Sequence, residues 1–465
     1  MDSIPDWIAQ LIAICGKDFV FTEPEILIQY GQDETEDLCF PPQCVVKPAN
    51  AEEISRILKL CNQYEIPLTP VGARTGLSGG ALSVHQGIAL STERLNRILH
   101  IDEKNLQVMV EPAVINQVLQ EAVLEKGLFY PPDPSSRGSC FIGGNIAENS
   151  GGARAVKYGV TKDYVLNLEV VLPDGSIIWT GANTLKNATG YNLTQLMIGS
   201  EGTLGIITKA VLRLLPAPQH QILLLVSFPS AEKACEAVSA VFRAGLTPSA
   251  LEFMERDAID WALKYVPDVH IAIDHDVQAL LLIELDGQHE MALVEEAEMI
   301  AEVVRGFECG NMLYAHDHQQ KETLWQLRRC IGHAVKTNSI YKEEDTVVPR
   351  YELPGLLKVV KETGRKYGFQ SVCYGHAGDG NLHVNIIKGK LSDAEWEHEV
   401  PKGIREIFEF VVAKKGTISG EHGIGYVQRN YMPIAFDRTQ MALMKGIKAL
   451  FDPNNILNPG KIFPD

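Results

Sequence analysis

Three glycine-dense segments constrain the fold of this chain more than any other feature of its sequence. They run from Gly72 to Gly87, from Gly138 to Gly159 and from Gly199 to Gly205. Glycine has no Cβ, so its backbone reaches conformations closed to other residues and can approach a ligand closely. Successive N–H groups in such a loop form a nest that suits an anion such as a pyrophosphate. Three such loops in one half of a chain favour a dinucleotide ligand over tight turns alone.

The spacing of these glycines excludes several familiar nucleotide and hydrolase motifs. None of the loops is a Gly-x-Gly-x-x-Gly segment that opens a helix, and none is a P-loop, so NAD binding of the Rossmann type and P-loop chemistry do not fit. Gly76–Gly80 satisfies the Gly-x-Ser-x-Gly pattern with Ser78 as its serine. That nucleophile elbow requires a helix after the serine. Ala81–Gly87 follows instead, with no helical periodicity, which argues against a serine hydrolase.

Composition narrows the class of protein further. A length of 465 residues predicts two or three domains. Lysine and arginine total 42 against 59 acidic residues, a net charge of −17 that disfavours nucleic acids and anionic membranes as partners. The apolar runs fall short of the ~18 residues that span a bilayer, and the N-terminus lacks a signal-peptide pattern. The 9 scattered cysteines contain no Cys-x-x-Cys, which argues against an iron–sulfur cluster and for a reducing compartment.

The segments between the glycine loops predict a mixed α+β domain. Short β-branched runs such as Gln107–Val110 and Ile206–Leu215 are typical of strands. Asn50, followed by Glu53 in capping-box position, predicts the start of a helix over Ala51–Tyr64.

A proline-rich segment, Leu215–Pro218, predicts a domain boundary, because two prolines end any regular element there. Strand and helix patterns alternate beyond it and indicate a second, antiparallel sheet covered by helices. The predicted elements are Ile222–Phe228 (strand), Ala231–Ala244 (helix), Ala279–Leu285 (strand), Glu290–Arg305 (helix) and Arg438–Phe451 (helix).

The sharpest chemical signal lies in the C-terminal third of the chain. Leu382–Ile387 alternates as a strand does, which places His383 and Asn385 on one face. The turn Ala377–Gly380 can fold His376 back toward His383.

Glu421 and His422 follow in a glycine frame, Ser419-Gly-Glu-His-Gly-Ile-Gly425. Two imidazoles and one carboxylate are a common ligand set for zinc or a similar divalent ion with one position open for substrate. The sequence therefore predicts a metal site made of His376, His383 and Glu421.

Both groups of motifs carry a resemblance to one family. Pro70–Gly80, Pro132–Ser136 with Ile142–Gly152, and Gly190–Ile207 resemble the FAD-binding domain of the vanillyl-alcohol-oxidase (PCMH) type. Two further motifs, Gly-His-x-Gly-Asp-Gly-Asn-x-His at Gly375–His383 and Gly-Glu-His-Gly at Gly420–Gly423, narrow the resemblance. From about residue 20 onward, the chain resembles the subfamily that contains D-lactate dehydrogenase, D-2-hydroxyglutarate dehydrogenase and one of the subunits of glycolate oxidase. The resemblance implies an FAD domain over 1–217, a substrate cap with an antiparallel sheet over 218–425, and a C-terminal segment, 426–465, that returns to the FAD domain.

The resemblance also implies FAD. Some relatives attach their flavin through a histidine within or beside these loops, but this chain has Arg74 and Ala81 in the first loop and no histidine in either later loop, so we expect non-covalent binding. The residues it places at the cofactor are Pro70, Gly72, Arg74, Thr75, Gly76, Gly79, Gly80, Pro132, Ser136, Gly143, Gly144, Asn145, Asn149, Gly151, Gly152, Glu201, Gly202, Gly205, Ile206, Ile207 and Asn458.

For the reaction, the resemblance implies that His376, His383 and Glu421 hold a divalent ion, Zn or Mn, and that His422 is the general base. The residues implied at the substrate are Arg328, Asn385 and Lys342. A 2-hydroxy acid can chelate the ion, pass its hydroxyl proton to a neutral imidazole and release hydride from C2 to flavin N5. Electrons would then leave to a separate acceptor: an electron-transfer flavoprotein, a quinone path or an iron–sulfur subunit.

The substrate expected from the resemblance is a small monoacid, glycolate or D-lactate. Relatives that act on dicarboxylates carry a threonine where this chain has Gly332, and a lysine in the region of Lys342 where Glu343–Asp345 is acidic.

Several alternatives stay open on the sequence. They are a D-2-hydroxyglutarate dehydrogenase, a same-fold sugar oxidase or ether-forming transferase, a hydrolase that uses zinc-bound hydroxide or Ser78, and a non-catalytic subunit. We expect a cytoplasmic enzyme that acts on a small molecule, binds no nucleic acid, is not an integral membrane protein and could sit at the inner membrane through a partner; a homodimer is left open.

Overall fold

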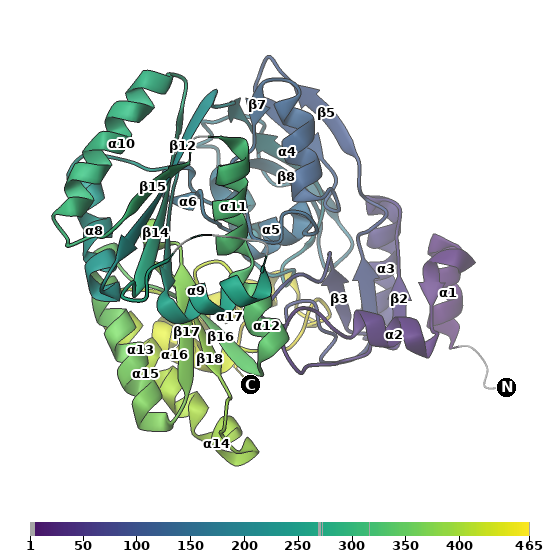
Figure 1. Ribbon diagram of the computed structural model, residues 1–465. Helices are drawn as coiled ribbons and strands as arrows, with labels where there is room; N and C mark the ends of the chain where they lie inside the picture. The colour runs from purple at the N-terminus through teal and green to yellow at the C-terminus, as the bar shows by residue number, and fades with distance from the viewer. Residues whose placement is uncertain (1–4, 268–270, 272, 316, 465) are drawn as a thin grey trace. The chain divides into compact units, whose positions relative to one another are not determined.

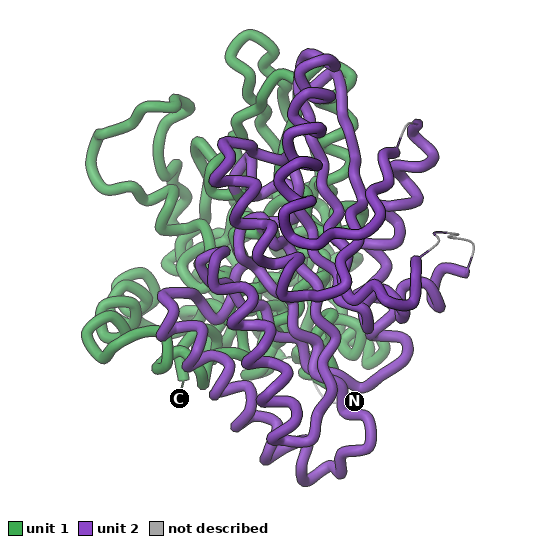
Figure 2. The backbone as a smooth tube through the Cα atoms, turned by 60° about the vertical axis from the view of Figure 1, so that its left-hand side comes forward, with its two compact units in different colours: residues 1–150, 160–217, 421–465 green, residues 151–159, 218–420 purple. Residues whose placement is uncertain are grey.

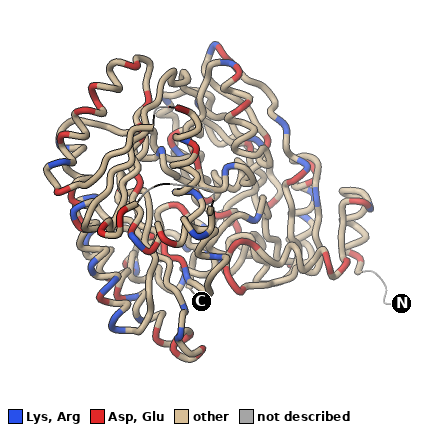
Figure 3. The backbone as a smooth tube through the Cα atoms, viewed as in Figure 1, with Lys and Arg blue, Asp and Glu red and all other residues tan. Residues whose placement is uncertain are grey.

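The computed structural model describes residues 5–267, 271, 273–315 and 317–464 of the chain. They form two compact units (Figure 2). Unit 1 takes the described parts of 1–150, 160–217 and 421–465, and unit 2 takes 151–159 and 218–420. The change of unit after Ala217 lies within the proline-rich segment, and the last return to unit 1 starts at Glu421 rather than at residue 426. Basic and acidic positions are interspersed along the chain of both units (Figure 3).

Unit 1 contains a four-stranded sheet, a five-stranded antiparallel sheet and a two-stranded pair, ordered β1-β2-β4-β3, β5-β6-β10-β8-β9 and β11-β7. Figure 1 labels β2, β3, β5, β7 and β8 of these strands. Its strands are β1 (Val20–Phe21), β2 (Cys44–Val46), β3 (Leu68–Val71), β4 (Ile88–Ser91), β5 (Ile98–Asp102), β6 (Gln107–Val110), β7 (Leu128–Phe129), β8 (Val165–Val171), β9 (Ile177–Trp179), β10 (Ile206–Arg213) and β11 (Leu215–Pro216). Its helices are α1 (Asp6–Cys15), α2 (Pro24–Tyr30), α3 (Ala51–Tyr64), α4 (Asn116–Leu124), α5 (Ile142–Glu148), α7 (Leu193–Met197), α16 (Met432–Ala435) and α17 (Arg438–Phe451), with 3₁₀ turns η1 (Lys17–Phe19), η2 (Thr161–Asp163) and η5 (Arg429–Tyr431).

The helix predicted over Ala51–Tyr64 is confirmed as α3. Its N-cap is Asn50, whose side-chain oxygen accepts the Glu53 backbone N–H at 2.8 Å, while the Glu53 carboxylate accepts from Ala49. Apolar side chains of α3, Ile54, Ile57 and Leu58 among them, are fully buried in the core of this unit.

One predicted loop of unit 1 is a helix. Residues 142–148 form α5 although two of them are glycines. A Cβ on Gly143 would meet Pro112 at 2.5 Å, so the close approach of α5 to Pro112 requires glycine there. Asn149 ends the helix in the left-handed conformation with φ 56°. The glycine content concealed this helix because glycine has low helix propensity.

Unit 2 contains one seven-stranded antiparallel sheet, ordered β15-β12-β14-β13-β17-β18-β16. Its strands are β12 (His220–Phe228), β13 (Ala250–Glu255), β14 (Ala279–Gly287), β15 (Met312–Ala315), β16 (Tyr341–Val347), β17 (Gln370–Gly375) and β18 (Asn381–Ile387). Its helices are α6 (Ala155–Tyr158), α8 (Ala231–Arg243), α9 (Arg256–Tyr265), α10 (Glu290–Arg305), α11 (His318–Arg329), α12 (Ile331–Asn338), α13 (Leu353–Tyr367), α14 (Asp393–His398) and α15 (Val400–Ala413), with 3₁₀ turns η3 (Arg350–Glu352) and η4 (Ala377–Asp379).

The sheet of unit 2 buries both of its faces. Helices α9, α11 and α12 share one apolar cluster with alternate residues of the strands, and α8, α10 and α13 contact the other face. The predicted antiparallel sheet covered by helices is therefore confirmed, and the chain has the α+β fold. Among the described residues, none of the helices combines the length and the apolar character needed to cross a bilayer.

Candidate active site

A tight connection between β17 and β18 brings two histidines of unit 2 together. Gly380 ends the turn η4 with φ +86°, and a Cβ there would meet the Val348 carbonyl oxygen at 2.0 Å, so only glycine fits. The chain turns back on itself, and the rings of His376 and His383 lie edge to face with centroids 5.4 Å apart. One ring nitrogen of each histidine lies within 4.8 Å of the other, close enough for both to reach one metal ion.

A carboxylate that the sequence analysis missed holds the first of these histidines. Glu252 of β13 is fully buried, and its oxygens lie 2.8 and 2.9 Å from His376 Nδ1. The same carboxylate accepts from Arg328 Nη2 at 2.7 Å. Burial by itself raises the pKa of Glu252, but the interactions with His376 and Arg328 outweigh it, and the pKa lies below its usual value. A charged residue inside the apolar run of β13 was the available signal.

Arg328 lies near the end of α11, and its side chain is almost fully buried. Its guanidinium also lies over the Tyr374 ring, with the central carbon 4.9 Å from the ring centroid. Arg328 Nε has no hydrogen-bond partner among the residues that the structure describes. One arm of the guanidinium is therefore fixed by Glu252 while Nε keeps its donor capacity for a ligand.

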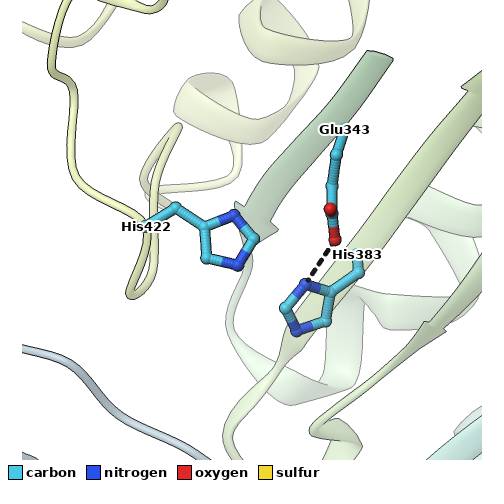
Figure 4. Close-up of side chains that lie close together, drawn as sticks. All are labelled: Glu343, His383 and His422. Carbon is cyan, nitrogen blue, oxygen red and sulfur yellow. Dashed lines mark ion pairs between the residues drawn. The ribbon is translucent and has the colours of Figure 1, made fainter. Parts of the chain in front are cut away.

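The second histidine has a carboxylate beside it as well. His383 Nδ1 lies 3.3 Å from a carboxylate oxygen of Glu343 on β16 (Figure 4, which also draws His422). Tyr374 stacks on the His383 ring with centroids 5.3 Å apart and planes 13° apart. The rings of Tyr374 and His376 and the carboxylate of Glu343 thus surround His383 within unit 2.

The register of β16 against β18 decides which side chains share this face. Glu343 pairs with Asn385 and Asp345 with His383, so these four lie on the same side of the sheet. Asn385 is fully buried, and neither atom of its amide has a hydrogen-bond partner in the described part of the chain. Buried amides in proteins are nearly always satisfied, so this one is suited to a ligand.

Lys342 does not share that face. It pairs with Ile386, which places it on the opposite side of the sheet, and its ammonium lies 5.1 Å from the centroid of the Trp396 ring. The expectation that Lys342 contacts the substrate is not retained, because alternation along β16 turns Glu343 rather than Lys342 toward Asn385.

The segment that carries Glu421 and His422 is anchored on both sides. The Gly420 N–H donates to the backbone oxygen of Asp345 at 3.0 Å and to its carboxylate at 2.7 Å. Asp345 is the strand partner of His383, so the backbone of Gly420 is tied to β16 at the level of that histidine. Glu421 is the next residue along the chain. Asp345 also accepts from Asn381 Nδ2 at 2.7 Å, and sequence reasoning assigned it no role.

The other anchor of this segment belongs to unit 1. The backbone N–H groups of Ile424 and Gly425 donate to the Glu201 carboxylate at 2.8 and 2.6 Å. Burial raises the pKa of Glu201, and these two hydrogen bonds partly offset the rise. Hydrogen bonds on each side of Glu421 and His422 therefore restrict the backbone of these two residues.

The three predicted cofactor loops converge within unit 1. A Cβ on Gly80 would lie 3.0 Å from the Glu148 carboxylate, one on Gly202 3.0 Å from Pro70, and one on Gly199 3.6 Å from Asn149. Asn458 joins the first and third loops, because its Nδ2 donates to the Gly80 oxygen at 3.1 Å and to the Glu201 oxygen at 2.8 Å.

The glycines of these loops fall into two groups. A Cβ on Gly76 or Gly144 would meet nothing within 4 Å, so these two expose bare backbone that a ligand can approach. Gly143 and Gly205 are packed against neighbouring residues and serve the fold. A cradle with open glycine backbone on converging loops fits a dinucleotide such as FAD.

Four other predicted cofactor residues either make contacts within the protein or belong to unit 2. Arg74 donates to the Gln29 oxygen and lies over the Tyr30 ring, with its guanidinium carbon 4.5 Å from the centroid. Ile206 is buried in the core of unit 1. Gly151 and Gly152 belong to the segment of unit 2.

The remaining predicted cofactor residues lie in the three loops or at their edges. They are Gly72, Thr75 and Gly79 in the first, Pro132, Ser136 and Asn145 in the second, and Ile207 at the start of β10. Asn116 connects the two parts of the second loop: its Nδ2 donates to the Pro132 oxygen at 3.1 Å, and its Oδ1 accepts from Asn145 at 3.3 Å.

Comparisons with known proteins agree with this architecture. The family model for FAD linked oxidases, C-terminal domain, matches residues 217–462, and the model for an FAD binding domain matches residues 42–181. The chain is 39% identical to glycolate oxidase subunit GlcD of Bacillus subtilis (strain 168) over 457 residues, which cover 98% of this chain and 96% of that protein.

Two further relatives carry different names. The chain is 37% identical to D-lactate dehydrogenase of Anaerostipes hadrus, covering 95% of this chain and 92% of that one, and 34% identical to D-2-hydroxyglutarate dehydrogenase of Stutzerimonas stutzeri (strain A1501), covering 99% of both.

Among solved structures, p-cresol methylhydroxylase with substrate bound matches with a TM-score of 0.81 at 18% identity, over 99% of this chain and 96% of that chain. A 4-ethylphenol oxidase from Gulosibacter chungangensis matches with a TM-score of 0.77 at 19% identity, over 99% and 97%. These likenesses show a shared fold of the vanillyl-alcohol-oxidase type. With the family model over more than half of the chain, they give one conclusion: the chain is an oxidoreductase that belongs to the family of FAD-linked oxidases.

Proposed function

We propose that this enzyme oxidises a small 2-hydroxy acid, glycolate or D-lactate, to the 2-oxo acid with FAD and a divalent metal ion. The names of its relatives support the substrate class, since all three describe an acid with a hydroxyl on C2. The observation that carries the proposal is the face of β16–β18 in unit 2. Two imidazoles with nitrogens within 4.8 Å, a buried arginine and a buried amide that has no hydrogen-bond partner in the described part of the chain contribute to it.

The proposed metal ligands are His376, His383 and Glu421. The donor set of two imidazoles and one carboxylate fits Zn or Mn. Glu421 is included because the residue before it, Gly420, is hydrogen-bonded to the strand partner of His383. A divalent ion, when bound, supplies Lewis acidity toward the hydroxyl and carboxylate oxygens of the acid.

The proposed substrate contacts are Arg328 and Asn385, and the proposed base is His422. The guanidinium supplies a fixed positive charge for the substrate carboxylate, and the amide of Asn385 can donate to and accept from the same molecule. His422 takes the hydroxyl proton on its imidazole. FAD, when bound in the loops of unit 1, is the acceptor of the hydride that leaves C2.

The acidic side chain at 343 favours a monoacid over a dicarboxylate. Glu343 shares the face of Asn385 and His383, and its negative charge repels a second carboxylate that extends toward β16. D-2-hydroxyglutarate stays the alternative because one relative bears that name.

The electron acceptor is proposed to be a separate carrier. The cysteines Cys15, Cys39, Cys44, Cys61, Cys140, Cys235, Cys309, Cys330 and Cys373 are all free thiols, and their spacing offers no cluster motif.

The test is anaerobic mixing of the FAD-loaded enzyme with 2-hydroxy acids of two to five carbons in both configurations, with loss of the oxidised flavin absorbance as the readout. We expect glycolate or D-lactate to reduce the flavin fastest. Faster reduction by D-2-hydroxyglutarate would assign the dicarboxylate instead, and a flavin that none of these acids reduces would overturn the proposal.

A further inference from the structure

A carboxylate at the centre of the sheet of unit 2 serves two of the proposed active-site residues at once. Glu252 lies in the middle of β13, and its side chain is 1% exposed. Its oxygens lie 2.8 and 2.9 Å from His376 Nδ1, and Oε2 lies 2.7 Å from Arg328 Nη2. Glu252 of β13 therefore contacts both His376, directly after β17, and Arg328 of α11.

Stability alone does not account for a charge at this position. The flanking residues Leu251 and Phe253 are buried and apolar, and the arginine that pairs with Glu252 is itself almost fully buried. Removing two charges from water costs several kcal/mol per ion, and well-packed apolar residues often replace such pairs without loss of stability. The contacts of Glu252 with both His376 and Arg328 therefore point to a role in the site.

The contact with His376 fixes the state of that ring. A carboxylate that accepts from Nδ1–H leaves Nε2 with its lone pair, which is the nitrogen available to a metal ion. The second histidine also has a carboxylate near the same nitrogen, because His383 Nδ1 lies at an ion-pair distance of 3.3 Å from Glu343. Both proposed metal-binding imidazoles thus turn Nδ1 toward a carboxylate.

The contact with Arg328 fixes the proposed anion-binding group. Ion pairing with Nη2 and stacking over Tyr374 hold the guanidinium plane, while Nε stays without a partner among the described residues. Without Glu252, the Arg328 charge would be buried and uncompensated.

We propose that Glu252 is a positioning residue that sets both the metal affinity, through His376, and the affinity for the substrate carboxylate, through Arg328. This inference rests on the proposed function. It adds one residue that positions both the metal-binding His376 and the carboxylate-binding Arg328. The two affinities are coupled because His376 and Arg328 share the Glu252 carboxylate. Its negative charge polarises the imidazole of His376 and balances the charge of the Arg328 guanidinium.

The test uses Glu252→Gln, which keeps the size and one acceptor oxygen but removes the charge. Loss of a carboxylate behind a metal-binding histidine typically weakens metal binding by about 10- to 100-fold. We expect the dissociation constants of Zn²⁺ and Mn²⁺ for the metal-depleted, FAD-loaded protein to rise by that factor, measured by competition with a chromogenic chelator. We also expect KM for the hydroxy acid to rise at saturating metal, because Arg328 loses its anchor.

Glu255→Gln is the matched control. Glu255 is a buried carboxylate on the same strand but on the opposite face, ion-paired with Lys361 at 2.7 Å. We expect the Glu255→Gln variant to keep the metal affinity and the KM of the parent, even if the variant is less stable. Glu252→Asp, which retains the charge with a shorter reach, should recover part of the metal affinity.

The outcomes separate the two proposals. If the parent binds neither metal, the proposed function fails. If the parent binds metal and Glu252→Gln binds it equally well with an unchanged KM, the role of Glu252 is refuted. Equal losses in Glu252→Gln and Glu255→Gln would also refute it, because they would show a general effect of removing a buried charge.

Discussion

At the scale of single residues, the sheet face of unit 2 combines groups that a protein core normally avoids. A fully buried carboxylate, an almost fully buried guanidinium and a buried amide without a hydrogen-bond partner among the described residues contribute to this face. Burying such groups costs free energy unless each is satisfied. Glu252 and Arg328 form an ion pair with each other, whereas neither atom of the Asn385 amide has a hydrogen-bond partner among the described residues, which makes Asn385 suited to testing binding against stability.

Asn385→Leu should separate stability from function. Leucine is close in size and removes an amide that has no hydrogen-bond partner in the described structure, so we expect the free energy of unfolding to stay equal or rise by about 1 kcal/mol. We expect KM for the hydroxy acid to rise at least tenfold. Urea unfolding and steady-state kinetics measure the two effects. A destabilised variant with normal KM would show that the amide serves the fold.

A second prediction at this scale concerns Lys461 in unit 1. Burial lowers the pKa of its ammonium from 10.5 to about 8, although Glu201, Asp33 and Glu148 oppose the shift. Between these two pH values Lys461 is protonated in the unfolded chain but neutral in the folded protein, so the free energy of unfolding rises with pH. The total rise is about 3 kcal/mol at ~1.36 kcal/mol per pKa unit. Below about pH 8 the penalty of the buried charge is fully present.

The measurement is urea unfolding of the parent and of Lys461→Met from about pH 7.5 to pH 10. Buried thiols such as Cys61, whose pKa burial raises to about 12, titrate in the opposite direction in both proteins and cancel in the difference. We expect the parent to gain stability relative to the variant as the pH rises. A difference that is independent of pH would contradict the assignment.

At the scale of elements, the hairpin of β17 and β18 creates the histidine pair. Its geometry depends on the single backbone position Gly380. Gly380→Ala places a Cβ 2.0 Å from the Val348 oxygen at a φ of +86°, so the turn must rearrange. We expect a loss of more than 1 kcal/mol of unfolding free energy, from backbone strain, and loss of metal binding.

Gly389→Ala is the control for this change. Gly389 also has a positive φ, +52°, but its Cβ would meet nothing within 4 Å, so only backbone strain applies. It should lower stability slightly and leave metal affinity intact. Retained metal binding in Gly380→Ala would mean that the turn does not set the histidine positions.

Sequence patterns predicted regular elements well where periodicity and caps acted together. Ala51–Tyr64, Glu290–Arg305 and Arg438–Phe451 are helices with the predicted bounds, and the strand at Leu382–Ile387 starts one residue earlier. The turn at Ala377–Gly380 was predictable because glycine spacing is a local signal. The helix α5 was not, because its Gly143 is required by the contact with Pro112, which only the tertiary structure reveals.

Pairings across the sheet could not be predicted from local signals. Glu252 lies more than 70 residues before Arg328 and more than 120 before His376, and the three come together only through the strand order of the sheet and the packing of α11 against it. The same reason explains Lys342: its face depends on the register of β16 against β18, and a shift of one residue exchanges it with Glu343. The metal ligands and the base stay predictions.

At the scale of the whole chain, unit 1 is assembled from segments far apart in sequence. The backbone of Leu68 donates to Ile456 and accepts from Asn458, and Lys448 donates to the Thr203 oxygen at 2.9 Å. Leu457 is fully buried in the core formed by the N-terminal strands and helices. Residues 421–464 are therefore part of unit 1 itself.

Leu457→Ala tests this assembly. Removing a buried leucine costs about 2–5 kcal/mol. We expect this loss in unfolding free energy together with weaker FAD retention during gel filtration, because Asn458, the next residue, joins two cofactor loops. Leu450→Ala, at a site 80% exposed, should change neither. Full FAD retention in a destabilised Leu457→Ala would show that the cofactor loops hold together without this segment.

The proposed reaction depends on a divalent ion held by His376, His383 and Glu421. The most direct measurement is flavin reduction by glycolate and D-lactate under anaerobic conditions in enzyme stripped of metal with a chelator, and again after one equivalent of Zn²⁺ or Mn²⁺ is added. We predict that the stripped enzyme retains its FAD but reduces it at least a hundredfold more slowly, and that the added ion restores the rate. Equal rates with and without metal would contradict the central claim.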